Sequence, residues 1–426
     1  MKNLTKYTCL LLGLVFVGAC ANLDYPDRFK ETQGVPKVNF VRYADRDIAI
    51  TQAAMEETIC IVGENLTSVH DIYFNDQPAV LNSSYMTANT IVLTVPKNLP
   101  VVQDDKMHLI TRDSSVVLYD FKVLPPAPKV ESMSAEWAAP GEKVIIAGSY
   151  LFAPLTVEFP GADPIEVTTS KAGGSEVEVT VPTGAQPGKV KITTASGTGQ
   201  SSFQYKDSRN MLFDWDGTYG MALGYGWRAG DKVLCAPGTH AFPALDGNYI
   251  AFSSDFDGTP YGAWAEDPCS FDYWPGEVGS AHAPLNSFDT FSQYINKYGV
   301  GGLCLKFEIL VPTSNPWTGV ALQLMFSSEN QVSESDMNNN YFSDDDFPRA
   351  VWEPWIATGS FDTGDKWQTV SIPLTDFNKK SNGSACATKF DDSYLHGLAF
   401  FVWGGSAEGK AGTPIIAIDN IRVVPL

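Results

Sequence analysis

The stretch Leu303-Cys304-Leu305-Lys306-Phe307-Glu308-Ile309 alternates strictly between apolar side chains and others. Successive side chains of a β-strand point to opposite faces of the sheet, so this alternation predicts a strand with one buried face. The predicted buried face carries Leu303, Leu305, Phe307 and Ile309, and the opposite face carries Cys304, Lys306 and Glu308.

The same alternation recurs on either side of this stretch. In residues 320–326 the apolar side chains fall on one face and Gln323 on the other. Residues 396–403 divide into one face with Leu398, Phe400 and Val402 and another with Ala399, Phe401 and Trp403. Such runs recur about every ten residues, separated by Gly, Pro, Asn and Asp, and helical periodicity is almost absent. The pattern predicts an all-β chain of sandwich domains.

An internal repeat divides the first half of the chain. Gly63-Glu64-Asn65-Leu66 has a counterpart 85 residues later in Gly148-Ser149-Tyr150-Leu151. Phe74 and Phe159 end strands at the same spacing, and Val95-Pro96 matches Val181-Pro182. Repeated spacing of this kind indicates a duplicated domain.

The repeated order resembles the IPT/TIG family of immunoglobulin-like domains over about residues 35–206. The resemblance implies that these domains act as spacers. The proline cluster Pro125-Pro126-Ala127-Pro128 between the repeats predicts a semi-rigid joint, because proline fixes the backbone and removes donors. Trp137 is the one tryptophan of this region, and the sequence leaves open whether it packs in a core or between domains.

The first twenty residues predict export and a lipid anchor. Lys2 and Lys6 precede an apolar run that is too short to span a bilayer, and Val17-Gly18-Ala19-Cys20 follows. This ending resembles a bacterial lipobox, which implies lipidation of Cys20. The predicted organisation is a signal peptide (1–19), a polar tether (20–34), two immunoglobulin-like domains (35–125 and 126–206) and a larger domain (207–426).

The last segment differs in composition from the rest. Nine of the ten tryptophans lie within residues 207–426, together with the long polar loops 255–285 and 327–348. Long loops inside a compact domain are uncommon unless they are functional, so we expect the site here. Trp215, Trp227 and Trp367 are assigned to packing.

The remaining aromatic residues are candidates for a sugar-binding platform, since aromatic rings stack on the C–H faces of sugars. In the cluster Trp352-Glu353-Pro354-Trp355, the proline predicts an edge strand or bulge that presents both indoles, although a core role for one of them is an alternative. Large aromatics in loops favour contact with a ligand. The candidate ligand-binding residues are Trp264, Tyr273, Trp274, Trp317, Trp352, Glu353, Trp355 and Trp403, with the polar Lys306, Glu308 and Gln323.

Two strings carry a wider resemblance. Trp367-Gln-Thr-Val-Ser-Ile-Pro-Leu-Thr-Asp-Phe377 and Ala417-Ile-Asp-Asn-Ile-Arg-Val-Val-Pro425 resemble those of jelly-roll carbohydrate-binding modules. The whole chain is similar to the surface glycan-binding lipoproteins of Bacteroidota polysaccharide-utilisation systems, particularly the xyloglucan-binding type. This resemblance implies two IPT/TIG sandwiches followed by a jelly-roll-like β-sandwich. It also implies an outer-membrane, cell-surface location and non-catalytic cooperation with a TonB-dependent transporter and companion lipoproteins.

The net charge of the chain limits the classes of ligand that it can bind. With 29 basic and 49 acidic residues the net charge is -20, which disfavours nucleic acid and an electrostatically bound membrane as partners. A neutral polysaccharide remains compatible, and flat exposed rings favour a β-linked hemicellulose such as xyloglucan, mixed-linkage glucan or mannan. A surface glycoside hydrolase or a protein-binding adhesin are the alternatives. Glu308 and Glu353 are the only glutamates in suggestive strand positions for the carboxylate pair of a hydrolase.

Metal and redox motifs are sparse. Cys60, Cys235, Cys269, Cys304 and Cys386 are scattered without a C-x-x-C pair; Cys60 and Cys304 lie in apolar runs typical of buried thiols. A disulfide among Cys235, Cys269 and Cys386 stays open. No cofactor is expected, except that Asp214, Asp216 and Asp419 could meet around a structural calcium; turns and strand caps explain these carboxylates equally well.

Overall fold

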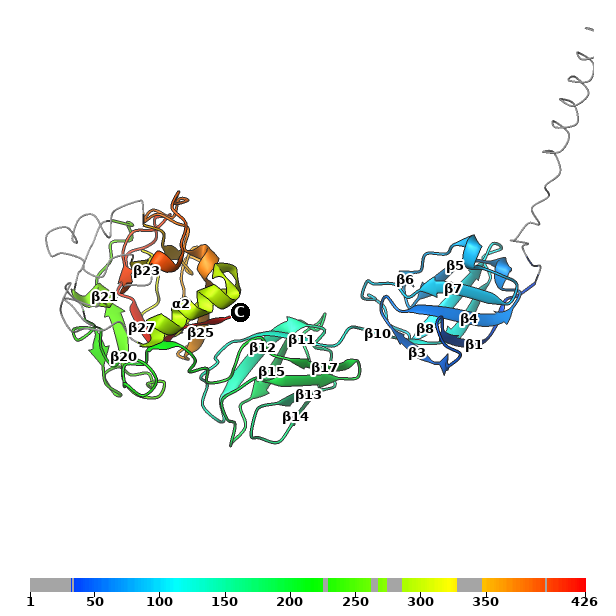
Figure 1. Cartoon of the computed structure of the whole chain (residues 1–426), viewed down its shortest axis with the longest axis horizontal. Coiled ribbons are helices and arrows are strands. Elements are labelled where there is room, and N and C mark those ends of the chain that lie inside the picture. The colour runs from blue at the N-terminus through cyan, green and yellow to red at the C-terminus, as the bar shows by residue number, and fades with distance from the viewer. Residues whose placement is uncertain are drawn as a thin grey trace, which may run out of the picture. The chain divides into compact units, whose positions relative to one another are not determined.

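The computed structural model describes residues 32, 34–224, 229–261, 267–273, 286–327, 347–394 and 397–426. Within these ranges the chain consists of β-strands, short turns and one α-helix, which confirms the all-β prediction. It divides into two compact units, residues 1–127 with 195–197, and residues 128–194 with 198–426. The main division falls at Ala127, inside the proline cluster (Figure 1).

Unit 1 is an immunoglobulin-like sandwich. Its two four-stranded sheets have the orders β2-β1-β4-β7 and β6-β5-β8-β9, and β3 pairs with β10 in parallel. One apolar core lies between the sheets. The strands are β1 (Lys37–Tyr43), β2 (Ala49–Ile50), β3 (Gln52–Ala54), β4 (Thr58–Glu64), β5 (Val69–Phe74), β6 (Gln77–Pro78), β7 (Thr90–Thr94), β8 (Lys106–Thr111), β9 (Val116–Asp120) and β10 (Lys122–Leu124).

Unit 2 begins with a second sandwich of the same design. Its sheets have the orders β11-β12-β15 and β14-β13-β16-β17, around a separate core. We call this part, residues 128–206, the second immunoglobulin-like domain. Its strands are β11 (Lys129–Met133), β12 (Lys143–Ser149), β13 (Leu155–Glu158), β14 (Ile165–Val167), β15 (Glu176–Thr180), β16 (Lys191–Thr194) and β17 (Gly197–Gln200).

The repeat seen in the sequence has a structural cause. A Cβ on Gly63 would lie 2.0 Å from the carbonyl oxygen of Lys37, and a Cβ on Gly148 would lie 2.0 Å from that of Lys129. Both glycines oppose a strand whose register shifts nearby, so only glycine allows the two backbones to approach this closely. The repeated leucines, phenylalanines and valines are all buried core residues (Leu66, Leu151, Phe74, Phe159, Val95 and Val181).

The rest of unit 2 is a larger two-sheet sandwich, the C-terminal sandwich. One sheet, the β27 sheet, has the order β19-β20-β27-β22-β25, with β18 also paired to β27. The other, the β23 sheet, has the order β21-β26-β23-β24. The strands are β18 (Met211–Phe213), β19 (Leu234–Cys235), β20 (Tyr249–Ser253), β21 (Ser270–Tyr273), β22 (Leu303–Leu310), β23 (Leu322–Ser327), β24 (Ala350–Trp352), β25 (Gln368–Pro373), β26 (Gly397–Val402) and β27 (Ile415–Pro425).

The core between these two sheets follows the predicted strand faces. Leu303, Leu305, Phe307 and Ile309 of β22 lie in it, as do Leu398, Phe400 and Val402 of β26. Trp215 also lies in this core, whereas Trp367 packs in a smaller cluster and donates its indole N–H to the carbonyl of Pro243 over 2.9 Å. The packing roles predicted for these two tryptophans are confirmed, and Trp227 lies outside the described residues.

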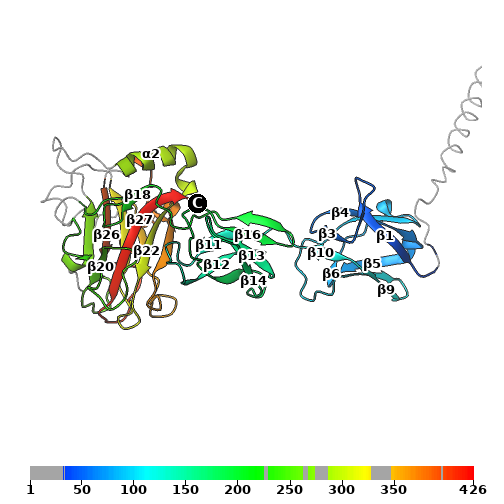
Figure 2. The same cartoon turned by 90° about the horizontal axis from the view of Figure 1, so that it is seen from below.

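Helix α2 (Asn286–Tyr298) packs along the C-terminal sandwich, against β18, β22 and β27 (Figure 2). Tyr294 and Ile295 of this helix are partly buried and pack against the core of the C-terminal sandwich. The helix therefore covers part of the sandwich. None of the described helices is long and apolar enough to cross a membrane.

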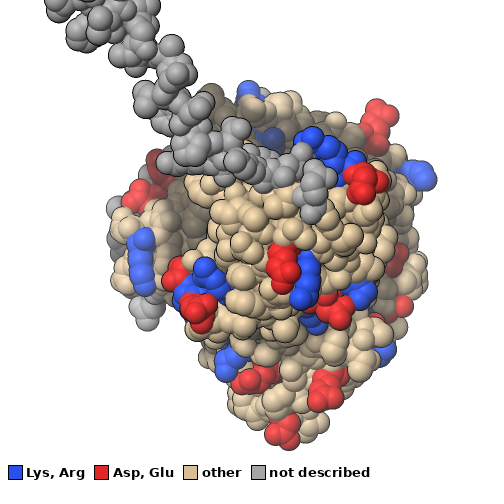
Figure 3. Space-filling view, turned by 90° about the vertical axis from the view of Figure 1, so that its right-hand side faces the viewer, with Lys and Arg blue, Asp and Glu red and all other residues tan. Residues whose placement is uncertain are grey.

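All five cysteines outside the first twenty residues are free thiols, so no disulfide forms among Cys235, Cys269 and Cys386. Cys60 and Cys304 are buried as predicted. Burial raises the pKa of the Cys304 thiol to about 11 and that of Cys269 to about 12, so both are neutral at physiological pH. On the face drawn in Figure 3, acidic and basic side chains are interspersed among uncharged ones.

Candidate functional site

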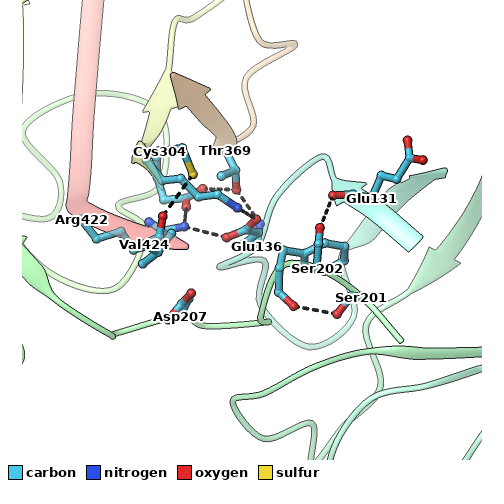
Figure 4. A network of polar contacts seen from close by, with 12 residues as sticks. Glu131, Glu136, Ser201, Ser202, Asp207, Cys304, Thr369, Arg422 and Val424 are labelled. Atoms are coloured by element: carbon cyan, nitrogen blue, oxygen red, sulfur yellow. Dashed lines mark hydrogen bonds and ion pairs between the residues drawn. The ribbon is translucent and has the colours of Figure 1, made fainter. Parts of the chain in front are cut away.

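The outer face of the β27 sheet, which carries Lys306 and Glu308, is covered by the second immunoglobulin-like domain. Glu136 of that domain is 2% exposed and accepts a 2.5 Å hydrogen bond from the Lys306 ammonium group. Its other carboxylate oxygen accepts from the Arg422 guanidinium group over 2.9 Å. A glutamate of one domain is thus held by two cations of the other (Figure 4).

Arg422 and Thr369 extend this network to Glu308. The same Nη2 atom of Arg422 donates to Glu308 over 2.9 Å, and the Thr369 hydroxyl donates to the second Glu308 oxygen over 2.7 Å. Burial raises the pKa of the Glu308 carboxyl, while the neighbouring Arg422 opposes that rise. Glu308 and Arg422 are both fully buried. We call the five connected residues Glu136, Lys306, Glu308, Thr369 and Arg422 the interdomain ion network.

Lys306 and Glu308 therefore occupy the face that alternation predicted, but they do not meet solvent. Lys306 is 7% exposed and Glu308 is 0% exposed. The expectation that these two side chains form part of an open sugar-binding surface is wrong in this structure. Glu136 of the second immunoglobulin-like domain pairs with Lys306, and Arg422 and Thr369 of the C-terminal sandwich hold Glu308. No local pattern around Glu136 indicates that it would be the partner of Lys306.

Three of the predicted platform aromatics are also buried. Trp317 is 0% exposed and donates its indole N–H to the carbonyls of Gly319 and Val320. Trp355 is 3% exposed and donates to the same Val320 carbonyl over 3.1 Å, and Tyr273 is 5% exposed. The expectation that these rings are presented at the surface is wrong, since all three pack in the core of the C-terminal sandwich.

Trp352 and Glu353 have structural contacts of their own. The Trp352 ring is half-buried and packs edge-to-face against Phe307, Trp317 and Phe361 with centroid distances of 5.5–6.0 Å. The Glu353 carboxylate accepts hydrogen bonds from the backbone N–H and the hydroxyl of Ser406, over 2.8 and 2.6 Å. Glu353 follows a strand of the β23 sheet, whereas Glu308 lies in the β27 sheet, so the two glutamates belong to different sheets.

The outer face of the β23 sheet is apolar and aromatic. Met325, Ala399 and Phe401 form a buried cluster, against which Phe347 and Trp403 pack. The half-buried Trp403 ring meets Tyr261 edge-to-face at 4.9 Å, and Tyr261 is 47% exposed. We call Tyr261, Phe347, Phe401 and Trp403 the outer aromatic cluster.

The amide side chain of Gln323 lies beside the outer aromatic cluster. The Gln323 side chain is 0% exposed, and its amide N–H groups donate to the carbonyls of Trp403, over 2.7 Å, and Ser381, over 3.0 Å. Its carbonyl oxygen accepts from the buried Arg349 over 3.0 Å. Gln323 lies on the predicted face, but it positions the backbone of Trp403 instead of meeting solvent.

This arrangement combines what a neutral sugar needs. Exposed aromatic edges and faces can stack on sugar C–H groups, and the backbone around Trp403 is fixed by buried hydrogen bonds. Among the predicted residues, the structure brings Trp403 and Gln323 together here. Trp264 and Trp274 lie outside the described residues, although Trp274 directly follows the last residue of β21. Tyr261 and Phe347 are not among the predicted ligand-binding residues, and their position within the long loops 255–285 and 327–348 was the available signal.

Two of the residues predicted for calcium accept hydrogen bonds within the fold. The Asp214 carboxylate accepts from the backbone N–H groups of Gly217, Thr218 and Tyr219, so it caps a turn. Asp216 accepts from the backbone N–H of Asn248 over 3.0 Å. Within the described ranges no group of three or more His, Cys, Asp or Glu side chains could hold a metal ion. Asp214 and Asp216 thus have structural contacts of their own, and the calcium site stays a prediction.

A two-sheet sandwich carried on immunoglobulin-like domains defines the class of fold, and its function has to come from the site that the fold carries. The family model for the xyloglucan binding domain of surface glycan-binding protein B matches residues 205–425. The crystal structure of the surface glycan-binding protein PbSGBP-B from Prevotella bryantii is 32% identical, with a TM-score of 0.71. The match covers 92% of this chain and 99% of that one. The chain therefore belongs to the surface glycan-binding protein B family.

A curated relative supports the assignment of the immunoglobulin-like repeats. An IPT/TIG domain-containing protein of Bacteroides ovatus is 28% identical over an alignment of 190 residues, and the match covers 39% of this chain and 37% of that protein. The chain thus matches little more than a third of that relative's length. Together the comparisons confirm the predicted family and the surface glycan-binding function.

Proposed function

We propose that the chain binds a β-linked hemicellulose of the xyloglucan class without cleaving it, through the outer aromatic cluster of the β23 sheet. The observation that carries this proposal is the contrast between the two outer faces of the C-terminal sandwich. The charged face is covered by another domain, whereas the aromatic face keeps Tyr261 and Trp403 partly exposed. The family model matched by this segment is named for xyloglucan binding.

The chemistry of the cluster suits an uncharged, equatorially linked chain. Aromatic rings recognise the C–H faces of pyranose rings, which are flat and exposed in β-1,4-linked backbones. The net charge of -20 disfavours anionic ligands by repulsion. Trp264 and Trp274 remain predicted members of the same surface.

Binding without hydrolysis is supported by the positions of the candidate carboxylates. Glycoside hydrolases need two carboxyl groups about 5–10 Å apart on either side of the bond to be cleaved. Glu308 is fully buried in the interdomain ion network, and Glu353 holds Ser406 on the other sheet. Neither is free to act on a sugar as a pair with the other.

The cell-surface setting of the family extends the proposal to location and partners. We infer that Cys20 is lipidated and anchors the chain in the outer membrane, with the immunoglobulin-like domains acting as spacers. A glycan captured at the surface would then pass to a TonB-dependent transporter assisted by companion lipoproteins. Labelling with a clickable palmitate analogue tests the anchor: Cys20→Ala should lose the label.

Binding is tested with the full chain in affinity gels containing xyloglucan, mixed-linkage glucan, galactomannan or an α-glucan. We expect retention by a β-linked glucan, no release of reducing sugar, and roughly 30-fold weaker binding for Trp403→Ala, as for a hot-spot residue. Tyr85→Ala, which alters an exposed tyrosine of unit 1, serves as the matched control.

Each contrary result has a distinct meaning. Release of reducing sugar would establish a hydrolase. Lack of retention by every glycan would favour a protein-binding adhesin. Normal retention of Trp403→Ala would show that the outer aromatic cluster is not the site.

A further inference from the structure

A recess lies where the second immunoglobulin-like domain meets the C-terminal sandwich. It has a volume of about 290 Å³. Trp137 and Lys206 contribute from one side, and Asp216, Tyr219, Asp246 and Asn420 from the other. This recess is next to the covered β27 sheet, so it is separate from the outer aromatic cluster on the β23 sheet.

Its aromatic pair is held in place by the fold. The Trp137 and Tyr219 rings meet edge-to-face with centroids 6.1 Å apart. Tyr219 is 56% exposed, and its backbone is fixed by the turn that the buried Asp214 carboxylate caps. An exposed ring on a fixed turn can stack against a ligand without first becoming ordered.

Two buried polar atoms among the lining residues lack hydrogen-bond partners within the described protein. The indole N–H of Trp137, a residue 6% exposed, has no acceptor, and the side-chain carbonyl oxygen of Asn420, a residue 1% exposed, has no donor. Buried polar groups are nearly always paired, so an orphan donor and an orphan acceptor at one recess indicate a missing partner. A hydroxyl group can pair with either atom, because it donates one hydrogen bond and accepts others.

The charged lining restricts the ligand further. Carboxylates of Asp216 and Asp246 accept hydrogen bonds from hydroxyls but repel anions, and Lys206 adds a donor. Asp214 also lines the recess, but both its carboxylate oxygens accept hydrogen bonds from backbone N–H groups of the turn. A metal ion is disfavoured, since no group of three His, Cys, Asp or Glu side chains within the described ranges could hold one. The chemistry left is that of a neutral, hydroxyl-rich ring with an apolar C–H face.

We propose that this recess is a second glycan-contact site, which binds one sugar unit, a chain end or a branch, of the polysaccharide held at the outer aromatic cluster. The choice of ligand class rests on the proposed function. Two contacts on one long glycan raise its retention beyond that of either contact alone, whereas a short oligosaccharide occupies them independently. The recess would therefore favour long or branched chains.

The test uses the full chain labelled with 5-fluorotryptophan and observed by ¹⁹F NMR, with the Trp137 resonance assigned from Trp137→Phe. Adding xyloglucan oligosaccharides should shift the Trp137 resonance in the wild type and in Trp403→Ala. The resonance of the core residue Trp317 serves as an internal reference. Tyr219→Ala and Asp216→Asn should abolish the Trp137 shift and weaken retention of polymeric xyloglucan about tenfold. Tyr85→Ala should change neither.

The outcomes separate this inference from the proposed function. If other tryptophan resonances shift and Trp137 does not, the second site is wrong while the proposed function stands. If no resonance shifts with any glycan, the proposed function itself fails. If calcium chloride moves the Trp137 resonance and glycans do not, the recess is a cation site and the inference is overturned.

Discussion

The two outer faces of the C-terminal sandwich use the same strand geometry for different purposes. The β27 sheet presents Lys306, Glu308 and Arg422, all nearly or fully buried under the second immunoglobulin-like domain. The β23 sheet presents Met325, Phe401 and Trp403, beside the exposed Tyr261. The face of charges is thus matched by an opposite charge from another domain, whereas the face of rings keeps Tyr261 and Trp403 partly exposed.

This difference teaches that polar residues on a predicted outer face do not by themselves mark a ligand site. Glu136 is 170 residues from Lys306 and 286 from Arg422, yet it binds both. Buried charges are tolerated only when they are paired and hydrogen-bonded, so the covered face needed this partner. Substitutions on the two faces should therefore differ in their effects on stability and on glycan binding.

Removing the arginine of the interdomain ion network should have the largest effect. Arg422→Ala leaves Glu136 and Glu308 buried without their shared cation, which should lower the free energy of unfolding by about 3–5 kcal/mol. Chemical denaturation of the full chain, followed by far-UV circular dichroism, measures the loss. Lys143→Ala, from an exposed pair with Glu178, is the control and should change little. Equal effects of the two variants would mean that the network does not stabilise the fold.

On the opposite face, Gln323→Leu should cost about 2–3 kcal/mol and weaken glycan binding. The leucine cannot replace the hydrogen bonds to the carbonyls of Trp403 and Ser381, which leaves buried acceptors without these donors. Thermal unfolding and affinity gels measure the two effects. Gln368→Leu, which removes one partly buried bond to Thr363, is the control. Unchanged binding of Gln323→Leu would separate this amide from the site.

The threonine of the interdomain ion network should matter less. Thr369→Val keeps the shape of the side chain but removes the bond to Glu308 and the acceptor for the Glu136 backbone N–H. We expect a loss of about 1–2 kcal/mol in denaturation, with glycan binding unchanged. A loss of binding without a loss of stability would show that the covered face takes part in recognition.

The smallest effect is a pH dependence at Asp419, on the same face as Glu308. Burial, and then the nearby Asp246, raise the pKa of the Asp419 carboxyl well above its ordinary value. The neutral Asp419 carboxyl contributes fully to the free energy of unfolding below about pH 3.9. This contribution is lost as the pH rises through the raised pKa of the folded state. Asp419→Asn should therefore melt higher than wild type at pH 7, with a difference that shrinks towards pH 4.

The control for this prediction is Asp376→Asn, at an exposed aspartate, which should show no such trend. Melting temperatures between pH 4 and pH 8 provide the measurement. A constant difference between Asp419→Asn and wild type across this range would contradict the assignment of the raised pKa.

Much of the fold could be predicted because alternation and spacing are local properties. The faces of residues 303–309, 320–326 and 396–403 are those that alternation predicts. The repeat of Gly63 and Gly148 reflects one backbone approach that occurs twice. The composition of the last segment also located the glycan-binding part, which the family comparison confirms.

The tryptophans show where local reasoning ends. Trp317 and Trp355 were predicted at the surface because they lie near prolines and loops, but both indoles satisfy their N–H groups on the Val320 carbonyl inside the core. An indole can be buried anywhere its one donor finds an acceptor, and that acceptor is placed by the tertiary fold. Trp137 packs against Tyr219 across the two parts of unit 2, which answers a question that the sequence left open.

By itself, the sequence determined the class of fold, the duplicated domain, the buried thiols and the side of each sheet on which Lys306, Glu308 and Gln323 lie. The tertiary structure decided what lies on those sides: Glu136 over one face, and the rings of Tyr261 and Trp403 on the other. The physical reason is that alternation fixes the direction of a side chain relative to its own strand. Whether that direction leads to solvent, a ligand or another domain depends on packing between residues far apart in the chain.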